Sequence, residues 1–340
     1  MKLTQHQVEK PWGRTILPGP FGSTEGKRIG EIWFEPLDGN ADLPLLTKYI
    51  FTSDRLSIQV HPGEQEAQGR GLAHGKSECW YILDCDPGAT LGLGLKQPVT
   101  RDELRAAALD GSIERLVDWR PVAAGEFYFV PPGTVHAIGA GISLLEFQQN
   151  VDVTYRPYDY SRPRELHLDD GIAVSHGAPY PAECARPAAC GSADAILVDG
   201  PIFSLIRASS PDAIPASIRT RRRWVMPIRG TIEAGRMRIG RRLPVGRARR
   251  RPGVRTSCGG FDRRRGTRLR HAIGWGGRIR TCECRYQKPV PYHLATPQQA
   301  HPHMCGRAAL ITMEEGKGSR WGTTLSPICR RPVPLGPHRV

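Results

Sequence analysis

Short strand-like segments separated by glycine and proline turns fill the chain from residue 28 to residue 147. GEIWFEP, LSIQVHP, ECWYILDC, EFYFVPP and SLLEFQQ are each seven or eight residues long and rich in aromatic and β-branched side chains. One segment of helical character, TRDELRAAALDGSIERLVDW, interrupts them. It opens with Thr100 and Glu103 at capping-box spacing, and Gly111 is expected to divide it into two short helices. Many strands with one helical excursion predict an antiparallel barrel or jelly roll.

Charge divides the chain into two unlike parts. The 340 residues carry a formal net charge of +15. Residues 1–215 hold 19 Lys and Arg against 28 Asp and Glu, a net of −9, whereas residues 216–340 hold 29 against 5, a net of +24. The basic character therefore belongs to the last third, and the part that contains the strand pattern is acidic.

The distribution of apolar residues and of cysteines indicates the cellular compartment of the protein. No run of eighteen apolar residues occurs, and the first residues, MKLTQHQVEKPWGR, lack the apolar segment of a signal peptide. We therefore expect a cytoplasmic protein that does not enter a membrane. The nine cysteines show no regular spacing, so no disulfide framework is predicted.

Two histidines, a glutamate and a glutamine suggest a metal site. Gln59 and His61 alternate onto one face of a strand, Glu78 lies on the next strand, and His136 follows the rigid sequence VPPG. A single buried histidine is usually a hydrogen-bonded core residue. Here His61, Glu78 and His136 occur together in one pattern of strands, which favours a catalytic Zn²⁺ site with an open position. The amide oxygen of Gln59 is the candidate fourth ligand.

The motifs around these residues resemble a known family. GEFYFVPPGTVH places Gly125, Pro131, Gly133 and His136 at the spacing of the second cupin motif, although Ala140 stands where that motif has asparagine. QVHP replaces the His-x-His of many cupins. Together with KPWG, LLTKYIFTSDRLSIQVHP and EFQQNVDVTYRPYDYSR, it is similar to the short bacterial form of the type I mannose-6-phosphate isomerases. The resemblance extends from about residue 8 to residue 180.

The resemblance implies one Zn²⁺ per chain and an aldose–ketose isomerase that interconverts mannose 6-phosphate and fructose 6-phosphate through a cis-enediol. The metal ligands that it implies are Gln59, His61, Glu78 and His136. The further active-site residues are Arg156, Lys76 and Glu146. Arg156 would stabilise the enediolate, and either Lys76 or Glu146 would transfer protons. Lys48 and Arg162 are candidates for the phosphate group by charge alone.

Two other functions stay open. One is a metal-binding cupin with different chemistry, such as an oxygenase, for which a more histidine-rich iron site is typical. The other is a sugar-phosphate-binding protein without catalytic activity. Gln59 and Glu78 favour the zinc isomerase over the first, and the complete set of matched positions favours it over the second.

The resemblance, together with the strand and charge patterns of the remaining residues, predicts the domain organisation. Residues 1–183 are expected to form a catalytic cupin domain, a jelly-roll β-barrel with a helical insertion at about residues 100–119. Residues 184–238 are expected to begin a second, incomplete cupin-like β unit. Residues 239–340 are expected to be a basic tail of low order, because they show no sustained apolar period.

The basic tail invites two interpretations. Its many arginines could bind nucleic acid, but aromatic residues are sparse among them and the cysteine–histidine spacing matches no standard zinc module. We therefore expect no nucleic-acid partner, and a monomer is favoured. The excess of arginine, glycine, proline and cysteine is typical of a GC-rich gene read in another frame. We hypothesise that a frameshift or read-through of non-coding sequence produced this tail.

Overall fold

The computed structural model describes residues 3–18, 21, 23–36, 43–188, 194–210, 213–215, 223–234, 237–241 and 304–315. Within these ranges the chain forms three sheets in which neighbouring strands are antiparallel. Four short α-helices accompany them. The expected mainly β class is confirmed.

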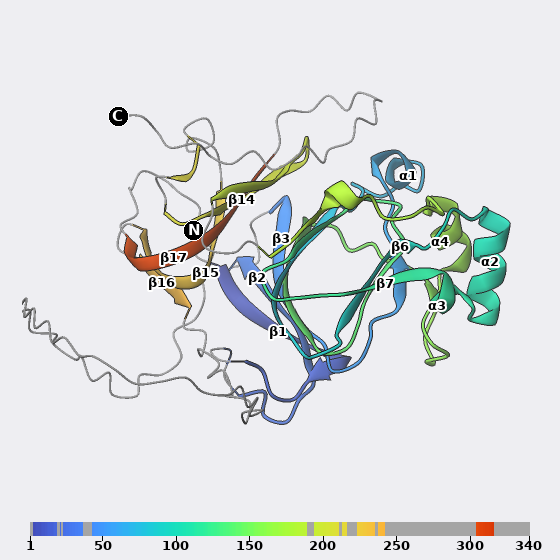
Figure 1. Ribbon diagram of the computed structural model, residues 1–340, viewed down its shortest axis with the longest axis horizontal. Coiled ribbons are helices and arrows are strands. Elements are labelled where there is room, and N and C mark those ends of the chain that lie inside the picture. Colours follow the sequence, from blue (N-terminus) through green and yellow to red (C-terminus); the bar gives the residue numbers. More distant parts are fainter. Residues whose placement is uncertain are drawn as a thin grey trace, which may run out of the picture.

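Two sheets build the barrel (Figure 1). The first has the strand order β1-β2-β3-β10-β5-β8-β12. These strands span, in that order, Leu3–Arg14, Ile29–Pro36, Leu45–Phe51, Ile142–Gln149, Glu78–Cys85, Phe127–Val130 and Ala185–Arg186. The second sheet has the order β11-β4-β9-β6-β7. Its strands span Tyr155–Tyr158, Ile58–Val60, His136–Ile138, Thr90–Leu95 and Val117–Pro121. Side chains of both sheets share one apolar core, so the two sheets close into a jelly roll.

The helical insertion follows its sequence signals. Helix α2 covers Arg101–Asp110, with the capping box of Thr100 and Glu103 formed at its start. Gly111 ends α2 with a φ of 80°, a left-handed conformation that suits glycine, and α3 follows at Ile113–Leu116. The helical part ends before the expected residue 119, because Val117 already pairs with Leu95 in the second sheet.

Two more helices complete the described residues. Helix α1 covers Glu64–Gln68 and α4 covers Leu168–Val174, and a single 3-10 turn lies at Ala182–Cys184. Helices α2, α3 and α4 gather at the end of the barrel beyond β6 and β7 (Figure 1). No helix among the described residues is both long enough and apolar enough to cross a bilayer.

The third sheet contains a strand from the basic tail, residues 239–340. Its order is β13-β14-β17-β15-β16. These strands span Ala195–Asp199, Phe203–Ala208, Met304–Glu315, Arg223–Ala234 and Met237–Arg241. Strand β17 lies between β14 and β15 and pairs with both. The basic tail was expected to be of low order, so this strand is a difference from the prediction. A strand can form here because the run AALITM in β17 is apolar. The rest of the tail, the domain limits and the frameshift hypothesis lie outside what the described residues test.

The third sheet and the barrel share a core. Trp224 and Met226 of β15 are buried in the same cluster as Tyr49 of β3. The Tyr49 hydroxyl lies 3.5 Å from the Met226 sulfur. Figure 1 shows this sheet beside the β1–β3 side of the barrel, opposite the helices. Apolar burial therefore joins the third sheet to the first sheet of the barrel, through β15 and β3.

Candidate metal centre and its cavity

A tight turn before β9 positions one histidine against the strand that carries the other. Thr134 N–H donates to the Pro131 carbonyl (3.2 Å), which closes a turn with Pro132 and Gly133 at its centre. Gly133 has a φ of 78°, and a Cβ there would lie 2.4 Å from the His176 ring. Its N–H donates to the His61 carbonyl (2.8 Å). The Pro-Pro-Gly sequence thus ties the backbone of β9 to the end of β4.

Three buried side chains converge between the two sheets. Glu78 comes from the first sheet, whereas His136 begins β9 and His61 directly follows β4 in the second. His61 Nε2 lies 3.2 Å from Glu78 Oε2, and His136 Nε2 lies 3.4 Å from Glu78 Oε1. One potential ligand atom from each residue lies within 4.8 Å of the others. The sequence-based grouping of these three residues is therefore seen in the structure.

The tautomer of His136 follows from its backbone contact. Its Nδ1 lies 2.8 Å from the Thr134 carbonyl oxygen, which can only accept a hydrogen bond. Nδ1 therefore carries the proton, and Nε2 presents a lone pair toward Glu78. Nε2 is buried without a hydrogen-bond partner. A buried ring nitrogen with a free lone pair beside a carboxylate is a donor set that fits a divalent metal ion.

Electrostatics keep all three groups in the forms that bind metal. Burial, reinforced by the Lys76 ammonium, lowers the pKa of His61 to about 3. Burial also lowers the pKa of His136. For Glu78, burial acts to raise the pKa, but Lys76 and His61 outweigh it and the pKa falls well below its ordinary value. Neutral imidazoles and an ionised carboxylate are the ligand forms that a metal requires.

Gln59 lies beside this group on the second sheet. It is the direct cross-strand partner of His136 in the β4–β9 pair, so both side chains face the same side of the sheet. Gln59 also lines the cavity described below. It is placed next to the histidines, as expected, and its role as a ligand stays a prediction.

A row of side chains crosses the first sheet next to Glu78. Glu146 of β10 is paired in register with Lys48 of β3 on one side and with Trp80 of β5 on the other. Lys48 Nζ lies 2.8 Å from Glu146 Oε1, and Trp80 Nε1–H donates to Glu146 Oε2 (3.0 Å). Burial and the Glu78 charge raise the pKa of Glu146, and Lys48 compensates only in part. Lys76 Nζ lies 3.2 Å from Glu78 Oε2.

Arg156 faces the same space from β11. It is half-buried, and its Nη1–H donates to the Thr154 carbonyl (3.2 Å). Among the described residues it forms no ion pair, although Asp152 and Asp159 are near in sequence. Asp159 pairs with Arg162 and Arg164 instead. Burial and the Arg164 charge lower the pKa of Arg156, which nevertheless remains a cation at neutral pH.

A single cavity of about 560 Å³ connects these groups. Its lining includes the expected site residues Gln59, Lys76, Glu78, His136, Glu146 and Arg156. It also includes Lys48 and Arg162, which the sequence offered as candidates by charge alone. Four further lining residues were not singled out from the sequence: Trp80, Glu31, Gln148 and Arg164.

The strand period contains a signal for two of these additional residues. Trp80 follows Glu78 by two positions and Gln148 follows Glu146 by two, so each shares a face with its neighbour. Gln148 is also the register partner of Glu78, and its Oε1 is buried without a hydrogen-bond partner.

The chain is similar to known proteins both in sequence and in fold. No family model matches the chain. Mannose-6-phosphate isomerase from Streptococcus mutans is 38% identical over 198 residues, which are 55% of this chain and 62% of that protein. Mannose-6-phosphate isomerase ManA from Bacillus subtilis is 42% identical over 166 residues, 45% of this chain and 52% of that protein. The chain thus spans about half to three-fifths of the length of the curated relatives that it matches.

Solved structures of low sequence identity share the fold. The crystal structure of mannose 6-phosphate isomerase from Bacillus subtilis is 23% identical with a TM-score of 0.63, covering 92% of this chain and 98% of that one. A mannose 6-phosphate isomerase bound with zinc and yttrium is 13% identical with a TM-score of 0.59, covering 93% and 99%. The expected cupin fold is confirmed. The chain is similar to mannose-6-phosphate isomerases in sequence over about half of its length, and in fold over most of it.

Proposed function

We propose that the protein is a zinc-dependent isomerase that interconverts mannose 6-phosphate and fructose 6-phosphate. The observation that carries this proposal is the buried group of His61, Glu78 and His136, which opens into a cavity that also holds Glu146 and Arg156. The identity to curated mannose-6-phosphate isomerases supports the same activity.

The metal would be held by His61, Glu78 and His136, with Gln59 as the candidate fourth ligand. The unpartnered Nε2 of His136 and the ionised carboxylate of Glu78 fit a zinc ion by donor type. A solved structural neighbour is a zinc-bound mannose 6-phosphate isomerase. When bound, zinc supplies a Lewis acid that polarises substrate oxygens. One zinc ion per chain is proposed.

The side chains around the metal ligands have the properties that proton transfer between C2 and C1 requires. Glu146 would accept the proton from one carbon and return it to the other, because its raised pKa brings it closer to neutral pH than an ordinary carboxyl group. Lys48 and Trp80 fix both of its oxygens. A base with a single orientation is what a suprafacial transfer through a cis-enediol needs.

Two cations would act on the oxygens of the substrate. Lys76 is buried against Glu78 and would donate a hydrogen bond to a sugar hydroxyl or carbonyl oxygen. Arg156 has no carboxylate partner among the described residues, so its guanidinium group can turn to the negative charge of the enediolate. The proton acceptor is assigned to Glu146, and Lys76 is the alternative.

A coupled assay tests the proposal. Purified full-length protein is supplied with mannose 6-phosphate, and formation of fructose 6-phosphate is followed with and without a chelator. We expect activity that the chelator abolishes and that added zinc restores. Substrate binding without turnover would indicate a sugar-phosphate-binding protein, and activity that only iron and oxygen support would indicate an oxygenase. A role in mannose or nucleotide-sugar metabolism, in the cytoplasm and as a monomer, remains a prediction.

A further inference from the structure

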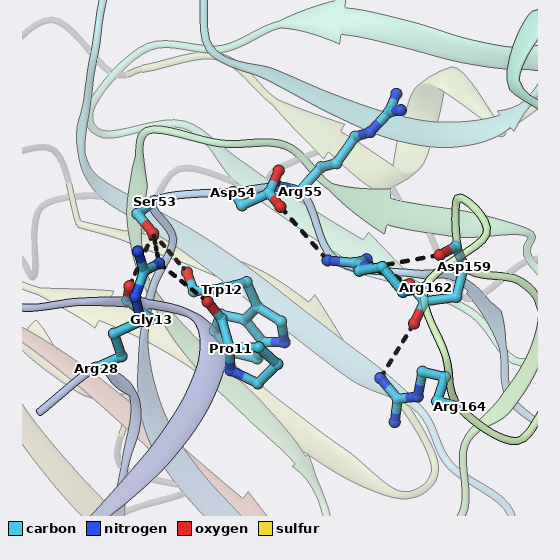
Figure 2. A network of polar contacts seen from close by, with 10 residues as sticks. All are labelled: Pro11, Trp12, Gly13, Arg28, Ser53, Asp54, Arg55, Asp159, Arg162 and Arg164. Atoms are coloured by element: carbon cyan, nitrogen blue, oxygen red, sulfur yellow. Dashed lines mark hydrogen bonds and ion pairs between the residues drawn. The ribbon is translucent and has the colours of Figure 1, made fainter.

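Ion pairs hold some of the side chains that line the cavity. Arg162 contacts the carboxylates of both Asp159 and Asp54, as Figure 2 shows. Lys76 pairs with Glu78 (3.2 Å), which is itself a candidate metal ligand. A lysine carries its charge on a flexible four-carbon stem, so the ammonium group reaches a given atom reliably only if the backbone is placed correctly. Whatever fixes the backbone of Lys76 therefore bears on its role.

Three consecutive backbone N–H groups around Lys76 are each held by a different partner. These partners lie outside the regular strand ladders, because the segment directly precedes β5. They are the Glu64 carboxylate for Gly75 (3.2 Å), the Pro62 carbonyl for Lys76 (3.0 Å) and the side-chain amide oxygen of Gln149 for Ser77 (2.9 Å). The peptide groups on both sides of Lys76 are thus fixed by hydrogen bonds.

Glu64 and Gln149 form one linked support. Gln149 Nε2–H donates to Glu64 Oε1 (2.8 Å), the same oxygen that accepts from Gly75 N–H. The Gln149 amide can take only one orientation, because its nitrogen faces a carboxylate and its oxygen faces the N–H of Ser77. Gln149 is buried, and the Glu64 side chain is 15% exposed. Hydrogen bonds to a carboxylate are stronger than those between neutral groups, so this support is firm.

The loop that contains Lys76 packs directly on the chain that follows His61. A Cβ on Gly75 would lie 2.5 Å from the carbonyl carbon of Gly63, so only glycine fits at this contact. Glu64 is the next residue after Gly63 and begins α1. The support therefore connects Lys76 to the segment that carries one of the candidate metal ligands.

We propose that Glu64 and Gln149 are positioning residues for Lys76, which fix its backbone so that its ammonium group reaches a substrate oxygen in the cavity. Lys76 lines the cavity, whereas Glu64 and Gln149 are not among its lining residues. They therefore act through Lys76 and not on the substrate. That Lys76 acts on a sugar oxygen rests on the proposed function. A displacement of about 1 Å at a reacting group can lower a rate about hundredfold, so the support affects turnover.

Amide hydrogen exchange of the full chain, followed by NMR, tests the support without turnover. We expect Glu64→Ala to speed exchange at Gly75 and at Ser77 about tenfold, because Gly75 loses its acceptor and Gln149 loses its anchor. Glu66→Ala is the matched control, since it removes a second glutamate from the same first turn of α1. Unchanged exchange at both amides, or an equal change in Glu66→Ala, would overturn the support.

Two conservative substitutions separate positioning from simple charge. Glu64→Gln keeps an acceptor oxygen at the same reach, whereas Glu64→Asp keeps the negative charge but shortens the side chain by one methylene group. We expect kcat to fall about tenfold to hundredfold in Glu64→Asp and to stay within about threefold in Glu64→Gln, with unchanged zinc content in both. Loss of kcat in Glu64→Gln with full activity in Glu64→Asp would indicate a structural charge and overturn the positioning role. Equal kcat in the two variants would overturn it as well.

The outcome is separate from that of the proposed activity. Faster exchange in Glu64→Ala, in a protein that does not isomerise mannose 6-phosphate, would overturn the isomerase and retain the support of the Lys76 backbone. An active enzyme that keeps its kcat in Glu64→Asp would retain the isomerase and overturn the positioning role. If Glu64→Ala does not fold, as judged by circular dichroism, exchange in Glu64→Asp decides, because that variant keeps a carboxylate at this position.

Discussion

Gly133 donates its backbone N–H to the carbonyl oxygen of His61, at 2.8 Å, and so joins the turn before one candidate ligand directly to the other. The contact depends on a left-handed φ of 78° and on the absence of a side chain, since a Cβ would lie 2.4 Å from His176. The rigid Pro-Pro-Gly sequence thereby sets the separation of the two histidines before any metal binds.

Gly133→Ala is expected to lower both stability and metal affinity. Strain from the positive φ alone costs about 1 kcal/mol, and the collision with His176 adds to it. Urea unfolding and zinc titration measure the two effects. Gly88→Ala is the matched control, because Gly88 also has a positive φ (83°) but no atom within 4 Å of the added Cβ. Equal losses in both variants would show that strain alone acts and that the His176 contact is unimportant.

His136→Ala is expected to abolish zinc binding and isomerase activity together. The substitution removes the buried lone pair that faces Glu78. Zinc content per chain, measured by elemental analysis after dialysis, is the direct readout. His74→Ala serves as the control, since the His74 side chain is 60% exposed. Unchanged zinc content in His136→Ala would contradict the assignment of the metal site.

Arg156→Gln is expected to retain zinc and to lose turnover by about a hundredfold to a thousandfold, as for removal of a group that stabilises an oxyanion. The half-buried guanidinium group has no carboxylate partner among the described residues, so its loss leaves no buried acid unpaired. Zinc analysis together with kcat in the coupled assay distinguishes the two effects. Near-normal turnover would exclude a catalytic role for Arg156.

The acidic limb of the pH profile is expected to follow Glu146. Below its pKa the carboxyl group is protonated and cannot accept a proton, so kcat/KM should fall as the pH falls. Because burial and Glu78 raise this pKa, the limb should lie above the ordinary value for a glutamate. Lys48→Met removes a charge that lowers the pKa, so the limb should move to higher pH. A limb that stays in place in Lys48→Met would argue for Lys76 or another group as the base.

Trp224→Ala is expected to destabilise the whole protein by about 3 kcal/mol or more, because a large side chain is removed from a shared core. Urea unfolding and zinc binding are measured for this variant. If unfolding and release of zinc occur together, at a lower urea concentration than in the unaltered protein, the third sheet supports the barrel. Leu109→Ala is the control, since Leu109 is 68% exposed on α2. Unfolding of the third sheet in a separate transition, with the barrel unaffected, would show that the two units are independent.

Local patterns in the sequence determined the elements and the identity of the candidate ligands. Short segments rich in aromatic and β-branched residues, separated by glycine and proline, predicted the barrel strands. The capping box and Gly111 predicted the two helices of the insertion. His61, Glu78 and His136 could be chosen because each sits on or beside a strand within a motif of fixed spacing. Such signals are readable because they depend on neighbours within a few residues.

Only the tertiary structure decided which distant groups meet. Lys48, Trp80 and Glu146 form one row because β3, β10 and β5 are adjacent in the sheet, although almost 100 residues separate Lys48 from Glu146. Asp159 lies three positions after Arg156 in the sequence, but it pairs with Arg162 and Arg164 and not with Arg156. Strand β17 enters the third sheet from a segment whose surroundings show no apolar period. Strand order and register set these contacts, because hydrogen bonding between strands joins segments whatever their separation along the chain.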